Sequence, residues 1–159
     1  MQTRLRIAAI TLCCVALPTP SSADLTAFVG SARTPSHRTA HGFALGMSFV
    51  LLGFEFEFSD SLEDQMTGAP SLRTGMFNVL LQTPSPFGLQ FYGTVGGGLY
   101  RERLGAVQEM NGGINAGGGV KLTLVGPLRA RVDYRVFTLQ GNPLFSRPKR
   151  IYAGLNLAF

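Results

Sequence analysis

The nine residues IYAGLNLAF, Ile151–Phe159, decide the fold. Apolar side chains take every second position and form one set: Ile151, Ala153, Leu155, Leu157 and Phe159. The intervening set is Tyr152, Gly154, Asn156 and Ala158. A period of two belongs to a β-strand and not to a helix. A strand with an apolar face and an aromatic last residue is typical of the strand that closes a transmembrane barrel, so we expect this stretch to face lipid.

The beginning of the chain has the pattern of a secretory signal peptide. Arg4 and Arg6 make a short basic segment, and the apolar run Ile7–Leu17 is too short to span a bilayer as a helix. Two prolines then break the run, and small residues precede the expected cleavage position. The sequence therefore predicts a signal peptide over residues 1–23 and an outer-membrane β-barrel domain over residues 24–159.

The composition of the predicted mature chain restricts its chemistry. Both cysteines, Cys13 and Cys14, lie within the signal peptide, so no disulfide and no cysteine-based metal site or nucleophile is expected. Once Arg4 and Arg6 are removed, basic residues exceed acidic residues by three, which is too few to indicate nucleic-acid binding. The 20 glycines suit the curved strands of a narrow barrel, where they relieve crowding and permit bending.

Eight alternating segments follow one another along this domain, each about as long as a tilted transmembrane strand requires. They cover roughly residues 24–32, 41–50, 52–60, 73–82, 89–101, 113–124, 128–139 and 150–159. The longer, polar connections are Arg33–Ala40, Ser61–Leu72, Glu102–Gly112 and Gln140–Lys149; the short ones lie around Leu51, at Thr83–Gly88 and at Val125–Pro127. Outer-membrane barrels alternate long outer loops with short periplasmic turns, so we expect both termini on the short-turn side.

The two faces of these segments differ in polarity. In the third segment Phe54, Phe56 and Phe58 point one way, whereas Glu55 and Glu57 point the other. The seventh segment places Ala130, Val132, Tyr134 and Val136 opposite Arg129, Arg131, Asp133 and Arg135. In a soluble lipocalin-like barrel the apolar face would line a pocket, whereas in a membrane barrel it faces lipid and the charges lie inside. The signal peptide, the last strand and the alternating loop lengths favour the membrane barrel.

Three stretches resemble the small eight-stranded outer-membrane barrels, the family of the OmpA transmembrane domain, OmpX and the opacity-type proteins. Residues Gly53–Ser59 resemble the third strand of that family, and Arg131–Arg135 resemble its penultimate strand. The last strand resembles the family's assembly signal, whose positions are filled by Tyr152, Gly154, Leu157 and Phe159. The resemblance covers the whole mature chain. It implies an all-β fold, an eight-stranded antiparallel up-and-down transmembrane β-barrel preceded by a cleaved signal peptide.

The same resemblance implies a location and partners. It implies export through the periplasm with periplasmic chaperones, insertion by the barrel-assembly machinery and residence in the outer membrane of a Gram-negative bacterium. There a monomeric barrel would contact outer-membrane lipids and lipopolysaccharide, with no cofactor and no nucleic acid. Because this family hosts many roles, the resemblance specifies the architecture better than the function.

Seven charged residues are expected to share the lumen as a charge network: Glu55, Glu57, Lys121, Arg129, Arg131, Asp133 and Arg135. An unpaired charge in a narrow interior is costly, so each must be paired or hydrated. One interpretation is a structural plug of salt bridges, and the other is an ion path or gate. Side chains nearly fill an eight-stranded barrel, so a wide solute pore is not expected.

Few residues have the chemistry for catalysis or metal binding. Ser36, His37 and His41 lie in or beside the first outer loop, which offers neither a fixed base nor a third orienting group. The His-x-Ser-Asn pattern of the eight-stranded lipid A deacylases is absent, because no histidine follows His41. Two histidines without further ligands do not make a metal site. We therefore expect neither a catalytic site nor a metal site.

Basic residues gather at the expected outer ends of the strands, whereas the short turns carry no charge. They provide five candidate contacts to lipopolysaccharide: Arg73, Arg101, Arg103, Lys149 and Arg150. The planar guanidinium group binds two phosphate oxygens at once, which suits arginine to lipid phosphates. Ordinary solvation of the loops is the alternative interpretation.

These observations predict a non-enzymatic integral outer-membrane β-barrel with a side-chain-filled lumen. It would contribute to envelope structure or to surface contact through its outer loops. The alternative is a narrow channel or small-solute porin, and a further alternative is a secreted lipocalin-like binding barrel. No motif in the sequence identifies a ligand or a receptor.

Overall fold

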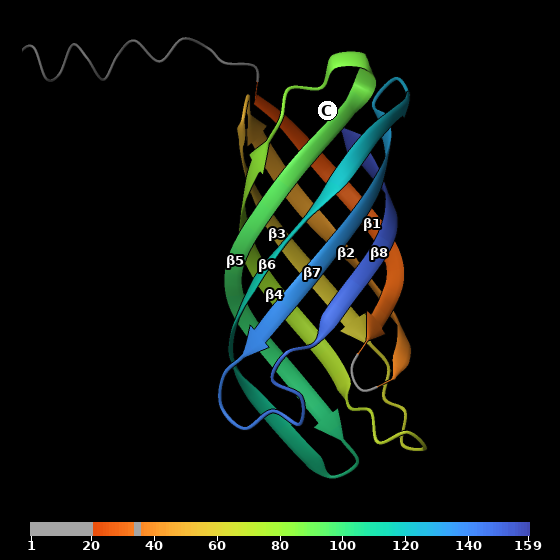
Figure 1. The fold of residues 1–159 in the computed structure, drawn as a ribbon, viewed down its shortest axis with the longest axis vertical. Coiled ribbons are helices and arrows are strands. Elements are labelled where there is room, and N and C mark those ends of the chain that lie inside the picture. The colour runs from red at the N-terminus through yellow and green to blue at the C-terminus, as the bar shows by residue number, and fades with distance from the viewer. Residues whose placement is uncertain (1–20, 34–35) are drawn as a thin grey trace, which may run out of the picture.

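The computed structural model describes residues 21–33 and 36–159, so most of the predicted signal peptide lies outside the described residues. Eight antiparallel strands form a closed barrel in which β8 pairs with β1 (Figure 1). They are β1 (Ser21–Arg33), β2 (His37–Phe49), β3 (Leu52–Ser61), β4 (Ser71–Gln82), β5 (Leu89–Leu104), β6 (Val107–Val125), β7 (Leu128–Leu139) and β8 (Lys149–Ala158). The prediction of an eight-stranded up-and-down barrel is confirmed.

Helical structure is almost absent from the described ranges. It is limited to the 3-residue turn η1 (Pro86–Gly88), which lies between β4 and β5. None of the described helical residues belongs to a helix long and apolar enough to cross a bilayer.

Two connections at one end of the barrel are longer than any connection at the other end. The turns 50–51, 83–88 and 126–127 lie at the end where the chain finishes (Figure 1). At the opposite end, called the loop end below, β1 ends at Arg33 and β2 begins at His37, and this end carries the connections 62–70, 105–106 and 140–148. The predicted alternation therefore holds for the second and fourth outer connections, and β2 begins earlier than predicted.

The predicted long loop Glu102–Gly112 is wrong. Strands β5 and β6 continue to a two-residue turn at Gly105, and their hairpin extends beyond the rest of the barrel wall (Figure 1). Gly105 adopts a φ of 58°, which a residue without a Cβ adopts easily. Beyond the apolar part of the wall, both faces of a strand meet polar surroundings. The loss of apolar alternation in this stretch therefore does not mark the end of the strands.

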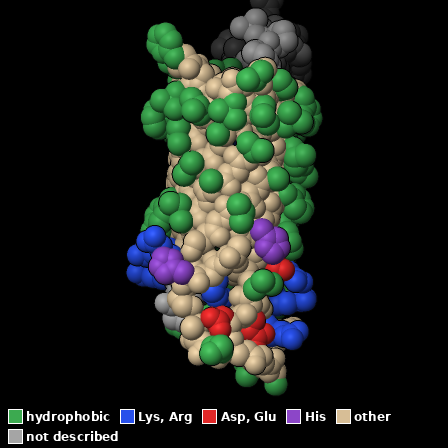
Figure 2. Space-filling view, turned by 90° about the vertical axis from the view of Figure 1, so that its right-hand side faces the viewer, with side chains coloured by type: hydrophobic (Ala, Val, Ile, Leu, Met, Phe, Trp, Pro, Cys, Tyr) green, Lys and Arg blue, Asp and Glu red, His purple; other side chains and the backbone are tan. Residues whose placement is uncertain are grey.

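The barrel wall is apolar outside and polar inside. Phe56 of β3 is 45% exposed on the outer surface, whereas the neighbouring Glu57 is fully buried in the lumen. Figure 2 shows apolar side chains on the outer surface toward the short-turn end and charged side chains gathered at the loop end. The predicted face assignment is therefore confirmed. This arrangement suits a lipid-facing wall and is the opposite of an apolar lipocalin pocket.

Glycines leave room for bulky side chains inside the barrel. The Tyr92 side chain lies against Gly119 of β6, where a Cβ would overlap with its ring and with the Val132 carbonyl. Gly42 of β2 leaves similar room for the Phe28 ring. The predicted role of glycine in relieving crowding applies at these positions, where the backbone closely approaches an aromatic ring.

Candidate functional site

Arg135 of β7 lies in the lumen and contacts three carboxylates. Its Nη2 donates to Glu55 Oε1 at 2.7 Å, and its Nε donates to Asp133 Oδ1 at 2.9 Å. Its Nη1 lies 3.1 Å from Glu57 Oε2. All four side chains are buried, so the pairing offsets the cost of removing these charges from water.

Arg131, two residues earlier on β7, adds a second cation to the same carboxylates. It pairs with Glu55, and its Nη2 lies 3.2 Å from Asp133 Oδ2. Tyr92 of β5 joins the two partners, because its hydroxyl donates to Asp133 Oδ2 at 2.5 Å and accepts from Arg131 Nε at 2.7 Å. The guanidinium carbon of Arg131 also lies 4.8 Å from the centre of the Tyr92 ring, which adds a cation–π contact.

A further ion pair lies on each side of this centre. Toward the short turns, Lys121 Nζ donates to Asp24 Oδ2 of β1 at 2.7 Å. Toward the loop end, Arg150 of β8 pairs with Glu57 and donates to Ser59. The acidic and basic groups are equal in number and together form the lumen network: Asp24, Glu55, Glu57, Asp133, Lys121, Arg131, Arg135 and Arg150. Its formal charge is zero, so it needs no counterions.

The lumen network differs from the predicted set at three positions. Arg150 is 4% exposed, and its guanidinium carbon lies 4.9 Å from the Phe137 ring centre, so its assignment as a lipopolysaccharide contact is wrong. The alternation of β8 could have predicted the burial of Arg150, because Arg150 lies on the same face of the strand as Tyr152. Asp24, the first residue of the predicted mature chain, was not predicted as a member of the lumen network. Arg129 is half-buried near the short turns, and no ion pair among the described side chains includes it.

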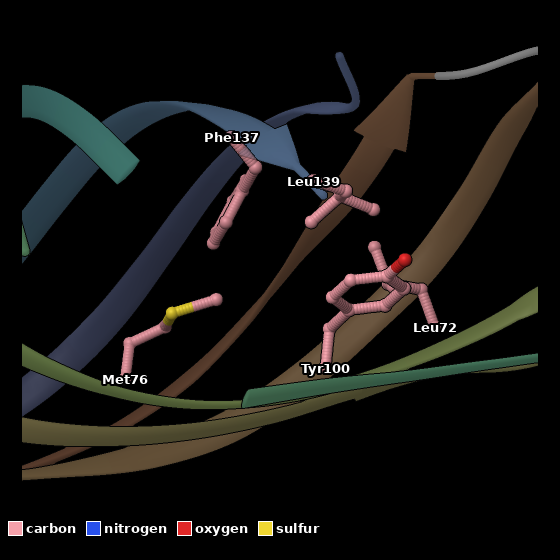
Figure 3. Close-up of a cluster of buried hydrophobic side chains, with 5 residues drawn as sticks. All are labelled: Leu72, Met76, Tyr100, Phe137 and Leu139. Carbon is pink, nitrogen blue, oxygen red and sulfur yellow. The ribbon is translucent and has the colours of Figure 1, made fainter. Parts of the chain in front are cut away.

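A second layer of side chains fills the lumen nearer the loop end. We call it the apolar cluster, and its members are Leu72, Met76, Tyr100, Phe137 and Leu139. These side chains extend from β4, β5 and β7 and converge on one another (Figure 3). The Tyr100 hydroxyl donates to the Gln140 carbonyl at 2.5 Å. Sequence reasoning missed this cluster, because Phe137 and Leu139 lie on the face of β7 that carries charges earlier in the strand.

The connection between β7 and β8 is tied to the projecting hairpin. The Leu144 N–H donates to Glu102 Oε2 at 2.7 Å, and the Asn142 N–H donates to Glu109 Oε1 at 2.7 Å. Glu102 and Glu109 lie directly opposite each other on β5 and β6. The hairpin that replaces the predicted third loop therefore holds the fourth outer connection in place.

The connection between β3 and β4 is held by its own acidic residues. Asp64 accepts hydrogen bonds from the Thr67 hydroxyl at 2.8 Å and from the Met66 N–H at 3.0 Å. The pKa of Asp64 is lowered, mainly because the Thr67 hydroxyl donates to its carboxylate. The Gly105 N–H donates to Glu63 Oε1 at 2.8 Å. This hydrogen bond is the main reason why the pKa of Glu63 is lowered. Both carboxylates therefore stay charged and bound at neutral pH.

Little space remains between the two layers of the lumen. A cavity of about 10 Å³ is lined by side chains of both, among them Arg150, Leu72 and Phe137. This is about the space that one water molecule requires. The larger hollows of about 590 and 510 Å³ lie on the outer wall and are lined mainly by its outward-facing residues. The described part of the lumen therefore lacks the open space of a solute pore.

Ser36 and His37, which were considered for catalysis, do not bond to each other. His37 Nδ1 lies 3.4 Å from Ser31 Oγ, whereas Ser36 Oγ lies 3.1 Å from Thr67 Oγ1. Both hydrogen bonds are exposed, and neither joins Ser36 to a histidine. Across residues 21–33 and 36–159, no group of three or more His, Cys, Asp or Glu side chains is placed to hold a metal ion.

The remaining predicted site residues lie on both sides of the wall. Four candidate lipopolysaccharide contacts are exposed at the loop end: Arg73, Arg101, Arg103 and Lys149. Within the proposed assembly signal, Tyr152 is buried in the lumen beside Gly154, whereas Leu157 and Phe159 are exposed on the outer surface. The motif therefore presents only its two hydrophobic positions to the outside.

Comparison with known proteins gives matches in structure only, since no protein-family model and no curated protein matches the chain. Neisserial surface protein A (NspA) matches with a TM-score of 0.70 and 13% identity, and the N-terminal β-barrel domain of Pseudomonas aeruginosa OprF with 0.67 and 12%. Ail, the attachment invasion locus protein of Yersinia pestis, matches with 0.54 and 12%. Each match covers 87% of this chain and 97% of the other. The chain therefore has the fold of the small eight-stranded outer-membrane β-barrels.

Proposed function

We propose that this chain is a non-enzymatic integral outer-membrane protein that contributes to envelope structure and offers its loop end for surface contact. The observation that carries the proposal is the double closure of the lumen, by the neutral lumen network and by the apolar cluster. A porin requires a water-filled passage instead. The apolar outer wall supports the membrane location, and the likeness in fold to a Neisserial surface protein supports a role at the cell surface.

Planar-bilayer recording of the purified protein tests the closed lumen. We expect no steady conductance from the wild type. Because two layers close the lumen, Arg131→Ala with Arg135→Ala should conduct weakly, and adding Phe137→Ala with Leu139→Ala should increase the conductance. The matched control is Arg147→Ala, which shortens an exposed arginine in the connection between β7 and β8. Large, stable wild-type channels would overturn the proposal in favour of a narrow channel or small-solute porin.

Cell fractionation and protease accessibility test the membrane location and orientation. The protein should enter the outer-membrane fraction and migrate differently on a gel before and after boiling, as a folded barrel does. A protease added to intact cells should cut in the projecting hairpin near Arg103, which is exposed. Cleavage restricted to permeabilised cells would show the opposite orientation, and recovery in the soluble fraction would contradict the membrane location.

The proposed route to the membrane includes periplasmic chaperones and recognition of β8 by the barrel-assembly machinery. Phe159 is exposed at the short-turn end, as is Phe87 of η1, so the two aromatic residues form a matched pair. Phe159→Asp should lower the amount of folded protein in the outer membrane, whereas Phe87→Asp should not. Equal yields from both variants would contradict the role of Phe159 in assembly.

A further inference from the structure

A shallow apolar groove lies on the outer wall across β4–β7. Its volume is about 590 Å³, and its apolar lining includes Phe77, Val79, Val95, Ile114, Ala116 and Val136. Gly97 also lines the groove, and because it has no side chain it keeps the floor of the groove low. In the register of the sheet, Gly97 lies between Phe77 of β4 and Ile114 of β6. A groove of this kind in a lipid-facing wall fits a linear hydrocarbon chain.

Two arginines lie beyond the loop end of this groove. On the outward face of β5, Gly97 is followed by Leu99 and Arg101, and the rise of a strand places Arg101 about 13 Å from Gly97. Arg101 lies directly opposite Arg73 of β4. A further hollow of about 290 Å³, lined by Leu99 and both arginines among others, continues the path from the groove to these cations.

The charges around these arginines are not balanced. Arg73 Nη2 lies 2.8 Å from Asp60 Oδ2, and Arg103 Nε lies 3.9 Å from Glu63 Oε2. Arg101 is exposed, and no ion pair among the described residues includes it. Like charges directly opposite on neighbouring strands destabilise a sheet. An anion bound to both Arg73 and Arg101 would therefore relieve their repulsion.

We propose that this groove and its arginines form a binding site for lipopolysaccharide, with an acyl chain in the groove and a phosphate between Arg101 and Arg73. The inference rests on the proposed outer-membrane function and gives that function a lipid partner. The apolar lining accommodates an acyl chain of a bilayer lipid through packing contacts. The Arg101 guanidinium group offers two parallel donors to phosphate oxygens, whereas Arg73, whose Nε and Nη2 donate to Asp60, adds its positive charge. A lipid without an accessible anionic phosphate leaves Arg101 unpaired, so charge and shape together select a phosphorylated amphiphile.

Thermal unfolding of the full barrel in phosphatidylcholine vesicles tests this site. A ligand that binds only the folded state raises the unfolding temperature as its concentration increases. Lipopolysaccharide should therefore raise the temperature at which the folded band is lost on a gel. Its dephosphorylated form should require about tenfold higher concentration for the same rise, because hydrogen bonds to charged groups are lost. Equal effects of both forms would overturn the phosphate assignment.

Two matched pairs of variants locate the site. Gly97→Leu fills the groove, and its Cβ would make only ordinary contacts; Gly93→Leu makes the same change on the same face of β5, outside the groove. Arg101→Gln removes the unpaired cation, and Arg147→Gln removes an exposed arginine elsewhere at the loop end. We expect Gly97→Leu and Arg101→Gln each to weaken the response to lipopolysaccharide about tenfold, and both controls to retain it.

The outcomes separate the lipid site from the proposed function. A barrel that folds in phosphatidylcholine vesicles but does not respond to lipopolysaccharide would overturn the lipid site and leave the membrane function intact. A chain that does not insert into vesicles would contradict the proposed function itself. If Gly97→Leu fails to fold, the comparison of Arg101→Gln with Arg147→Gln decides, and equal responses of these two variants would overturn the site.

Discussion

The lumen network and the apolar cluster close the same lumen by opposite chemistry. In the network, Arg135 contacts Glu55, Glu57 and Asp133, and each carboxylate lies against a different nitrogen of the guanidinium group. In the cluster, side chains such as Leu72 and Phe137 need only fill the space between β4, β5 and β7. Removing one partner of the network leaves a buried charge, whereas shortening a member of the cluster leaves a cavity. One region should therefore be sensitive to chemical identity and the other to volume.

The largest expected effect is that of Arg135→Leu. It should lower the free energy of unfolding by about 3–5 kcal/mol, because buried carboxylates lose a shared cation. Urea unfolding of the barrel in lipid vesicles measures the change, and the exposed Arg147→Leu is the control. A loss below about 1 kcal/mol would show that the network does not act as a set of mutually dependent ion pairs.

The volume rule for the apolar cluster can be tested at Leu72. Leu72→Ala should cost about 2 kcal/mol of unfolding free energy, at the low end for a buried leucine, because Leu72 is 8% exposed. Leu72→Met conserves volume and should cost clearly less. The same urea titration compares the two variants. Similar losses from Leu72→Met and Leu72→Ala would indicate that the cluster is also sensitive to side-chain identity.

Two tyrosines allow the same substitution in both regions. Tyr92→Phe removes a hydroxyl bonded to Asp133 and Arg131, whereas Tyr100→Phe removes one bonded to the Gln140 carbonyl. Hydrogen bonds to charged groups contribute more, so we expect losses of about 1.5 kcal/mol and about 1 kcal/mol in unfolding free energy. Equilibrium unfolding of both variants side by side gives the difference. The reverse order would mean that the charged partners rearrange to replace the Tyr92 hydroxyl.

The smallest net effect is expected when one ion pair of the network is replaced as a unit. Lys121→Met and Asp24→Leu should each destabilise the barrel, because each leaves the partner buried and unpaired. The double variant should unfold within about 1 kcal/mol of the wild type, since apolar residues of similar volume often replace a buried pair without loss. A double-mutant cycle on the refolded protein measures the coupling. Additive losses would show that the two charges do not depend on each other.

Much of the barrel was predictable because alternation with a period of two is a property of the strand itself. It correctly placed Phe56 outside and Glu57 inside. The errors arose where residue type was used in place of alternation. Arg150 was placed at the surface because it is charged, although its face is that of Tyr152. The hairpin of β5 and β6 was interpreted as a loop because its residues are polar.

By itself, the sequence determined the number of strands and which side chains face the lumen, since both follow from local alternation. Only the tertiary structure decided which of those side chains meet. Arg135 and Glu55 are 80 residues apart in the chain, and their hydrogen bond forms across the lumen of the closed barrel. Such a contact depends on the register of every strand between them. The same holds for Phe137, whose place in the apolar cluster follows from barrel closure and not from its neighbours in the sequence.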